Sequence, residues 1–545
     1  MTDKTTEWWR SAVFYQVYPR SFADSNGDGV GDIPGIISKL DYLADLGVDC
    51  LWLSPVYKSP NDDMGYDVAD HLDVGPEYGT LDDMRRLFAQ AKGRGIRIIM
   101  DLVVNHTSDE HSWFVAGRDP ASPYHDYYVW RPGRKRGRKE SPPNNWQSVF
   151  TGPAWERDAE TGLYYLHLFT KKQPDLNFRN PKVVAEVERI LDFWLDMGAA
   201  GFRCDVIGSL WKTTLADGRP RVFNTGEEHY LNQDGCHAIL RGLHERVLGP
   251  RGAYTVGETG GVDVAQYRRF TTGELTQVFQ FDHFGLTKAR VPVFPKRYRP
   301  EEMRRVLLRW HTLPEWNTVF FENHDETRSV DRYGDAGPHF ERSAKMLATV
   351  LLTLRGTPYL YQGEELGVTN APFADIGEIR DVASIDVYRL LRRFGLTEGL
   401  AMRVVNHFTR DHARRPFQWT AGAQGGFTTG TPWIAANPQA ATVNAETQGR
   451  APGSILNYHK ALIRLRRDHS ALVLGDLRVL DLARDVLAYT RGDGDEFAVV
   501  CNLGRRRRRL SRTLRGEVLL SNFVAPGDAT LGSVPPFGAV VLRLR

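Results

Sequence analysis

The chain has 545 residues, enough for one large domain with one or two smaller ones. Its 70 lysines and arginines nearly balance its 67 acids, so the net charge of +3 argues against a nucleic acid or a membrane as partner. The sequence has no signal-peptide core, no run near the roughly 20 apolar residues of a membrane span and no C-x-x-C pair, so we expect a cytoplasmic protein without disulfides.

Apolar runs of strand length alternate with amphipathic helical patterns along most of the chain. The eight strand candidates are residues 13–17, 50–53, 98–104, 201–205, 254–258, 278–281, 318–322 and 358–361. The clearest helical patterns between them cover residues 36–46, 81–92, 181–197, 300–313 and 342–354. Eight strands that alternate with helices predict an α/β fold, a (β/α)8 barrel rather than an open sheet.

Two further segments are expected to lie outside the barrel. Residues 107–177 are rich in Pro, Gly, Tyr, Trp and Arg, which is typical of a small loop-rich domain inserted after the third strand. From about residue 470 short alternating runs with turns between them predict an antiparallel β-sandwich. The predicted organisation is therefore a barrel of residues 1–106 and 178–469, an inserted domain of residues 107–177 and a C-terminal sandwich of residues 470–545.

Four of the predicted strands lead into acids. The runs are R-I-I-M-D-L-V-V-N-H (97–106), G-F-R-C-D-V (201–206), A-Y-T-V-G-E (253–258) and T-V-F-F-E-N-H-D (318–325). A buried carboxylate is costly unless it is paired, and Arg203 lies on the same strand face as Asp205. An isolated Arg-x-Asp would indicate a structural ion pair. Because the carboxyl ends of barrel strands meet at one rim, the four runs together favour an active site.

Several acids around one pocket suit either a divalent metal or the cleavage of a glycosidic bond. Barrels that bind metals usually combine acids with several histidines, and only His106 and His324 are available here. Glycoside hydrolysis needs one ionised and one protonated carboxyl group, with pKa values set apart by their surroundings. Arg203 would keep Asp205 ionised, whereas Glu258 has no cation in its own motif. The residues favour glycosidic chemistry without a catalytic metal.

These motifs resemble the signature regions of the α-amylase superfamily, glycoside hydrolase family 13. They stand in the family's order as D-L-V-V-N-H, G-F-R-C-D-V-I, V-G-E-T and F-F-E-N-H-D, and the resemblance covers nearly the whole chain. A fifth motif, Q-P-D-L-N (173–177), resembles the version of the oligo-1,6-glucosidase group. The resemblance implies Asp205 as the nucleophile of a retaining reaction, Glu258 as the acid/base and Asp325 as the carboxylate that stabilises the transition state.

The resemblance also implies residues that hold the terminal sugar in subsite −1. Arg203, His106 and His324 match family residues around this sugar. A lone histidine is usually a hydrogen-bonded core residue, but two histidines in separate motifs at one barrel rim favour a site. Within N-D-D-M-G-Y-D (61–67), the resemblance implies that Asp63 binds the non-reducing sugar and that Tyr66 stacks beneath its ring.

The segment T-R-D-H-A-R-R-P-F-Q-W (409–419) resembles one found in α-glucosidases. There Arg410 would join Asp63 in closing the far side of subsite −1, and Arg414 would border the next subsite. The alternative is a surface loop with ordinary ion pairs. A pocket closed behind one sugar can release only terminal residues, so the resemblance implies exo-action.

The segment D-S-N-G-D-G-V-G-D (24–32) places oxygen ligands at alternate positions. The candidate ligands are Asp24, Asn26, Asp28, the carbonyl of Val30 and Asp32. As a bare pattern the segment could be an acidic turn, and Gly35 stands where an EF-hand carries its bidentate glutamate. The resemblance implies a structural Ca²⁺ or Mg²⁺ and no catalytic cofactor.

Val206, directly after the predicted nucleophile, bears on the linkage that is cleaved. In relatives a valine here accompanies α-1,6 cleavage, whereas threonine or alanine accompanies maltose or sucrose. We therefore predict an exo-acting α-glucosidase that hydrolyses terminal α-1,6-linked glucose from isomaltose and isomaltooligosaccharides. The expected partner is a small oligosaccharide, with no nucleic acid and no membrane, and the expected state is a monomer or weak homo-oligomer.

Three alternatives stay open at this point. They are a maltase-like α-1,4-glucosidase, a sucrose isomerase or transglucosylase, and a non-catalytic binding subunit. The stretch 281–290 lacks the R-L-D-R-D loop of sucrose isomerases, and the retained acids speak against a binding subunit. Glu326 starts an E-T-R sequence where oligo-1,6-glucosidases commonly read Q-P-R, which makes the acceptor side unusual.

Overall fold

Eight parallel strands form the central sheet of the computed structural model, which describes residues 7–137, 139–289, 294–492 and 496–545. The start of the chain and the last residue of the stretch 281–290 lie outside this range. The strands are β1 (Phe14–Val17), β2 (Cys50–Leu53), β5 (Arg97–Leu102), β11 (Gly201–Cys204), β12 (Tyr254–Gly257), β13 (Gln277–Val278), β14 (Thr318–Val319) and β15 (Thr357–Tyr361). All eight fall within the predicted strand positions or overlap them.

The sheet curves into a nearly closed barrel. Its strand order is β13-β12-β11-β5-β2-β1-β15-β14, so β15 returns to pair with β1 and only β13 and β14 remain as edges. The hydroxyl of Thr318 in β14 donates to the carbonyl of Val278 in β13 at 3.5 Å, across the remaining gap. The predicted (β/α)8 barrel is confirmed.

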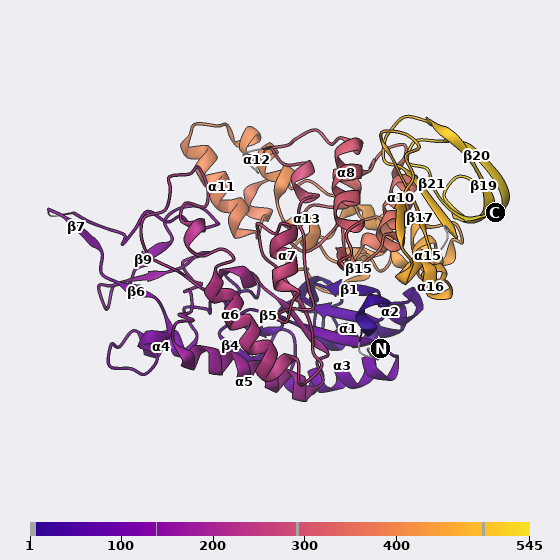
Figure 1. Cartoon of the computed structure of the whole chain (residues 1–545). Coiled ribbons are helices and arrows are strands. Elements are labelled where there is room, and N and C mark those ends of the chain that lie inside the picture. Colours follow the sequence, from indigo (N-terminus) through magenta and orange to yellow (C-terminus); the bar gives the residue numbers. More distant parts are fainter. Residues whose placement is uncertain (1–6, 138, 290–293, 493–495) are drawn as a thin grey trace.

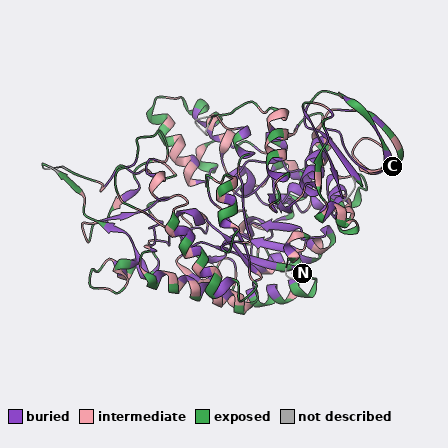
Figure 2. Ribbon diagram, viewed as in Figure 1, coloured by how far each residue is buried: buried purple, intermediate pink, exposed green. Residues whose placement is uncertain are grey.

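The barrel strands are buried on both faces, as expected for parallel strands covered by helices. Figure 2 shows this purple interior surrounded by helices whose outer faces are green. Gly201, the first residue of β11, has no room for a side chain, because a Cβ there would lie 1.8 Å from the carbonyl oxygen of Tyr254. Glycine at this position lets β11 and β12 approach and brings Asp205 and Glu258 to neighbouring strand ends.

Most helices lie around the sheet, and a few belong to segments that project from it (Figure 1). Their bounds are α1 (Ile33–Ser38), α2 (Leu40–Leu46), α3 (Leu81–Gly93), α4 (Ser112–Gly117), α5 (Pro181–Met197), α6 (Asp234–Leu243), α7 (Val264–Phe270), α8 (Pro300–His311), α9 (Ser329–Tyr333), α10 (Phe340–Thr353), α11 (Val382–Arg393), α12 (Glu398–Phe408), α13 (Asp411–Arg414), α14 (Ala445–Arg450), α15 (Ile455–Asp468) and α16 (Ser470–Leu474). The predicted helix 36–46 is divided at Lys39, which has non-helical dihedral angles. The other predicted helices agree with observed ones to within two residues.

The segment between β5 and α5 projects from the barrel on the left of Figure 1. It contains a three-stranded sheet of β6 (Trp130–Arg131), β10 (Tyr164–Leu166) and β9 (Trp155–Arg157), and a hairpin of β7 (Arg134–Arg136) and β8 (Lys139–Ser141). Trp146 and Trp155 lie in its small core together with Tyr230 from the barrel side. Two short strands, β3 (Tyr57–Lys58) and β4 (Asp70–Val74), pair nearby. The exact domain bounds stay a prediction.

The C-terminal residues form a six-stranded antiparallel sheet. Its order is β16 (Leu477–Val479), β17 (Val486–Arg491), β18 (Phe497–Asn502), β21 (Ala539–Leu544), β19 (Arg508–Ser521) and β20 (Gly527–Val534). The strands are joined as one sheet that encloses a core of its own, where Val500 and Val540 cluster with Leu514 and Leu531. This unit lies beside α10 and α15, at the upper right of Figure 1. Of the helices in the described ranges, none combines the length and apolar character that a bilayer crossing requires.

Candidate active site

A cavity of about 450 Å³ opens at the carboxyl ends of the barrel strands. All three predicted catalytic acids line it: Asp205 directly follows β11, Glu258 directly follows β12, and Asp325 lies in the loop after β14. The full lining is Asp63, Tyr66, His106, Val149, Phe150, Phe169, Gln173, Asp205, Val206, Glu258, Lys288, His324, Asp325, Asp381, Ala383, Phe408 and Arg410. Of the substrate residues predicted from the sequence, only Arg203 and Arg414 are missing from this wall.

Arg203 lies beneath the floor of the cavity and contacts three carboxylates. Its Nη1 donates to Asp101 Oδ1 at 2.7 Å and to Asp205 Oδ1 at 2.7 Å, and its Nη2 donates to Glu258 Oε2. The strand register explains this, because Arg203 pairs with Asp101 of β5 on one side and with Val256 of β12 on the other. Glu258 has no cation in its own motif, as predicted, and its cationic partner comes from the neighbouring strand.

Burial and charge act against each other on these acids. Burial raises the pKa of Asp205, and the Arg203 guanidinium opposes that shift without cancelling it. Burial likewise raises the pKa of Asp101 to about 6 against the pull of the same guanidinium. The carboxylates in turn hold the pKa of Arg203 well above its usual value, against the effect of its own burial. Arg203 is thus a permanent cation at the centre of the site.

Arg410 closes the far end of the cavity. Its Nη2 donates to Asp63 Oδ1 at 3.1 Å, its Nη1 donates to Asp325 Oδ1 at 3.1 Å, and its Nε donates to Asp381 Oδ1 at 2.8 Å. The structure thus brings together the Asp63 and Arg410 pair that the sequence predicts. Burial by itself would raise the pKa of Asp325, but the guanidinium groups around it, those of Arg410 and Arg414 among them, hold it well below its usual range.

Asp381 was missed by sequence reasoning. It is 1% exposed, precedes α11, accepts the Ser384 hydroxyl at 2.5 Å and lies within 2.6 Å of Arg410 Nη2. An aspartate before a helix is read as an N-cap, and Asp381 does accept from the Ala383 N–H. The N-cap pattern does not indicate that the same carboxylate also binds the guanidinium group of Arg410.

The two histidines and Tyr66 form one hydrogen-bonded and stacked group in the wall. The Tyr66 hydroxyl donates to Asp101 Oδ2 at 3.0 Å, and its ring stacks on His324 at 5.1 Å with an interplanar angle of 5°. His106 Nε2 lies 3.0 Å from the Tyr66 carbonyl and 3.1 Å from Gln173 Nε2. Burial lowers the pKa of His106 to about 4 and that of His324 to about 3, so both are neutral near pH 7.

Arg414 does not line the cavity. It is fully buried behind Asp325, where its Nη2 donates to Asp325 Oδ1 at 3.0 Å and its Nε donates to the His324 carbonyl at 3.0 Å. It therefore supports the third acid from behind, and its place beside the next subsite stays a prediction. A sequence motif gives the residues of a loop but not which side of the loop each faces.

Val206 adopts a left-handed backbone conformation, with φ 36° and ψ 38°. This region is uncommon for any residue except glycine and is strained for a β-branched one. The strained turn points the Val206 N–H toward Glu258 Oε2, at 3.4 Å, and leaves the side chain in the cavity wall. Local strain is therefore concentrated between the two predicted catalytic carboxylates.

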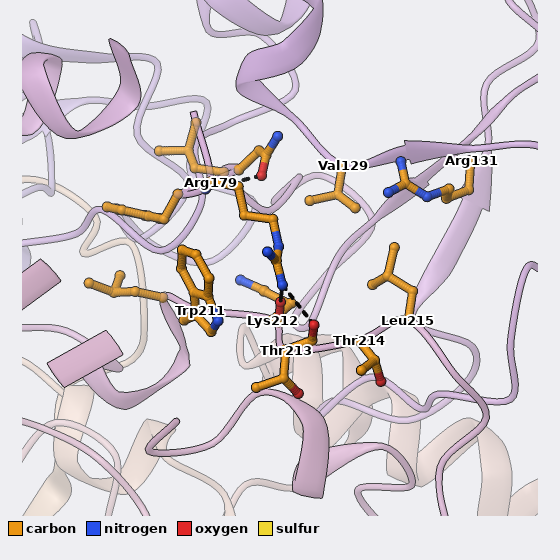
Figure 3. Close-up of a pocket in the computed structure, with 12 residues that line it drawn as sticks. Val129, Arg131, Arg179, Trp211, Lys212, Thr213, Thr214 and Leu215 are labelled. Carbon is orange, nitrogen blue, oxygen red and sulfur yellow. Dashed lines mark hydrogen bonds between the residues drawn. The ribbon is translucent and has the colours of Figure 1, made fainter. Parts of the chain in front are cut away.

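A second cavity, of about 290 Å³, lies behind the loop that follows β11 (Figure 3). Arg179 spans it and donates through Nη2 to the carbonyls of Lys212 and Thr213, at 2.9 and 2.7 Å. Lys212 Nζ also lies 2.6 Å from Asp175 Oδ2, in the Q-P-D-L-N motif. The three catalytic acids do not line this cavity, and its contacts anchor the loop after the predicted nucleophile to the inserted segment.

The candidate cation loop is held by its own side chains. Asp24 accepts the N–H groups of Gly27 and Gly29, at 2.8 Å each, and both glycines have left-handed φ angles, of 83° and 93°. Asp32 is buried and caps α1 through the Gly35 N–H at 2.6 Å. The candidate ligands of the loop are all hard oxygen atoms, the type that suits Ca²⁺. No set of three His, Cys, Asp or Glu side chains in the described chain is arranged as a metal cluster, so amide and carbonyl oxygens would have to complete this site.

Comparison with known proteins agrees with this geometry. The family model for the catalytic domain of α-amylase matches residues 16–475. The oligo-1,6-glucosidase of Parageobacillus thermoglucosidasius is 46% identical over 510 residues, covering 90% of each chain. The glucan 1,6-alpha-glucosidase of Streptococcus pneumoniae is 42% identical and covers 96% of this chain and 98% of its own. The crystal structure of isomaltulose synthase from Klebsiella sp. LX3 superimposes with a TM-score of 0.92 at 39% identity and covers 99% of both chains. On this evidence the chain belongs to the α-amylase family of enzymes, glycoside hydrolase family 13.

Proposed function

We propose that the protein is a retaining, exo-acting α-glucosidase that releases terminal α-1,6-linked glucose from isomaltose and isomaltooligosaccharides. One observation carries the proposal: Asp205 and Glu258 share Arg203 at the floor of a cavity whose far end is closed by Asp63 and Arg410. Paired carboxyl groups beside a one-sided pocket suit removal of one terminal sugar. The relatives named as 1,6-glucosidases support the linkage.

The reaction runs in two steps through the paired carboxyl groups. Asp205 attacks the anomeric carbon, while Glu258 gives its proton to the glycosidic oxygen and the bond to the leaving sugar breaks. Glu258, now a carboxylate, takes a proton from water, and the water oxygen displaces Asp205 from the glucosyl ester. Arg203 stabilises the carboxylate that forms in each step, that of Glu258 in the first and that of Asp205 in the second. Asp325, held by Arg410 and Arg414, binds the hydroxyls of the distorted sugar.

Replacement of the nucleophile tests the proposal. Asp205→Asn should lower glucose release from isomaltose and from an aryl α-glucoside on the order of 10⁴-fold, since a carboxamide cannot form the glucosyl ester. The variant should fold, because the amide still accepts from Arg203. Activity is measured by glucose release and folding by circular dichroism, with the exposed Asp45→Asn as matched control. Retained activity would reject the nucleophile.

Product analysis of the wild-type enzyme separates the remaining candidates. Incubation with isomaltose, maltose, panose and sucrose should give glucose fastest from the α-1,6 substrates. Similarity to an isomaltulose synthase keeps sucrose isomerisation as the second candidate. If the enzyme forms isomaltulose or trehalulose from sucrose, it is a sucrose isomerase and the hydrolase proposal is wrong.

We further propose that the loop of residues 24–32 binds a structural Ca²⁺ through Asp24, Asn26, Asp28, Asp32 and the Val30 carbonyl. Removal of the ion with EGTA should lower Tm, and excess Ca²⁺ should restore it, with about 2.7 kcal/mol of stabilisation expected at 100 times Kd. Asp28→Ala should abolish the response to Ca²⁺, while Asp119→Ala, in another loop, should keep it. A Tm that EGTA does not change would contradict the site.

A further inference from the structure

A further cavity, of about 360 Å³, adjoins the active-site cavity. The two cavities share Lys288 and Phe408 as wall residues. Most of the other side chains around it carry amide, hydroxyl or charged groups: Thr287, Lys296, Tyr298, Glu326, Thr327, Asp331, Arg332, Asn370, Asn406 and His407. A lining of this kind suits a neutral, hydroxyl-rich molecule better than an apolar one.

Lys288 is held in place at the boundary by a buried carboxylate. Its Nζ donates to Glu326 Oε1, and Arg332 Nη1 lies 3.3 Å from Glu326 Oε2. The side chains of Glu326 and Arg332 are 10% and 5% exposed, whereas Lys288 is 33% exposed. The hydroxyl of Thr287 and the carbonyl of Phe284 fix Arg332 in turn, at 3.3 and 3.2 Å. Arg332 thus holds Glu326, and Glu326 holds Lys288, whose ammonium group is the most exposed of the three.

The position of Lys288 relates it to the sugar that leaves. Asp63 and Arg410 close one end of the active-site cavity, and the bond to be broken must lie between Asp205 and Glu258. The released sugar must extend away from that closed end, and Val206, Lys288 and Phe408 are among the remaining residues of the lining. A lysine ammonium has three N–H donors, and Glu326 uses one of them in this structure.

We propose that Lys288 donates a hydrogen bond to a hydroxyl of the leaving glucose, that Glu326 positions it, and that the adjoining cavity binds the next sugar of a longer isomaltooligosaccharide. This inference rests on the proposed function and deepens it by assigning residues to the released part of the substrate. Glu326 is a positioning residue, because it acts through Lys288. The unusual E-T-R sequence after Asp325 thereby acquires a role in leaving-group selection.

Substitution of Lys288 tests the contact. Lys288→Met keeps the length of the side chain, and it should lower the ratio of kcat/KM for isomaltose to that for an aryl α-glucoside about 10–100-fold, mainly through KM for isomaltose. An aryl leaving group offers no sugar hydroxyl, so its cleavage is the internal reference. Glu326→Gln should shift the ratio in the same direction by a smaller factor, and the two changes should not add in the double variant.

Lys460→Met is the matched control, because Lys460 also pairs with a carboxylate, Asp45, but on the outer helices. It should leave the ratio unchanged. Equal losses on both substrates in Lys288→Met, or no loss on either, would overturn the assignment. If the wild-type enzyme does not cleave isomaltose, the proposed function fails instead, so the two failures are distinguishable.

Chain length tests the adjoining cavity separately. His407→Trp places a larger side chain in its wall and should lower kcat/KM for isomaltotriose about 10-fold relative to isomaltose, because the second released sugar then has no room. An unchanged ratio of the two substrates would reject this part of the proposal.

Discussion

At the scale of single residues, Val206 combines two properties that are normally kept apart. Its side chain lines the active-site cavity, and its backbone is left-handed. Strain of this kind costs on the order of 1–3 kcal/mol and persists only where the surrounding structure enforces it. The hydrogen bond from Ile207 N–H to the Glu258 carbonyl, at 2.8 Å, is part of what enforces it.

Val206→Thr should shift preference from isomaltose toward maltose. Threonine has nearly the same shape but adds a hydroxyl to the wall, and we expect the isomaltose to maltose ratio of kcat/KM to fall about 10-fold. Since both side chains are β-branched, the backbone strain is the same and Tm should change little. The ratio is measured by glucose release from each disaccharide. An unchanged isomaltose to maltose ratio would show that Val206 does not determine which linkage the enzyme prefers.

Residues at strand ends were predictable, and residues held by remote loops were not. Asp205 and Glu258 follow apolar runs, so the barrel rule alone brings them to one rim. The contact between Arg203 and Glu258 requires the register of β11 and β12, which short apolar runs do not reveal. Asp381 and Lys288 come from segments without a motif, and only the folded chain brings them to the cavity.

At the scale of elements, the short helical turn after β15 fastens the barrel to α2. Glu365, which is fully buried there, accepts the hydroxyl of Tyr15 in β1 at 2.8 Å and that of Tyr42 in α2 at 2.7 Å. No cation among the described residues shares these hydrogen bonds, and burial raises the pKa of Glu365 to about 7. The Glu365 carboxyl group thus connects β1, α2 and the turn after β15. Its burial disfavours the ionised form.

Stability near Glu365 should therefore depend on pH. Its folded pKa is raised above the unfolded value, so its contribution is fully present below about pH 4.5 and is lost as pH rises through about 7. Glu365→Gln should remove this dependence, so that the Tm advantage of the wild type over the variant shrinks between pH 5 and pH 8. Each unit of pKa shift corresponds to about 1.4 kcal/mol.

Thermal melting at several pH values checks this expectation. Glu446→Gln, on the exposed face of α14, is the control and should show a constant difference from the wild type. A constant difference for Glu365→Gln as well would mean that its carboxyl group titrates normally.

At the scale of the whole molecule, the C-terminal sheet completes the outside of the barrel. The Tyr489 hydroxyl in β17 lies 2.6 Å from the Thr353 hydroxyl at the end of α10. Arg491, fully buried, donates to the carbonyls of Thr353, Val473 and Gly475, at 2.6, 2.8 and 3.0 Å. Because α10 leads into β15 of the barrel, these contacts connect the C-terminal sheet to the barrel.

We expect the barrel and the C-terminal sheet to unfold in one transition. Arg491→Leu leaves buried carbonyls without donors and should lower Tm by about 3–8 °C, with activity lost at the same temperature. Calorimetry and residual activity after heating measure the two effects. The exposed Arg484→Leu, also in the C-terminal sheet region, should leave Tm unchanged. Two separate transitions would show that the sheet does not stabilise the barrel.

The shared guanidinium of Arg203 has a consequence for the kinetics of the whole enzyme. Asp101 and Asp205 contact the same cation, so a proton gained by one of them changes the proton affinity of the other. A limb of the pH–rate profile that involves Asp205 will then report a macroscopic constant of this coupled group, not a value for Asp205 alone. Asp101, which does not line the cavity, belongs to that group, and its protonation is part of how the enzyme responds to acid.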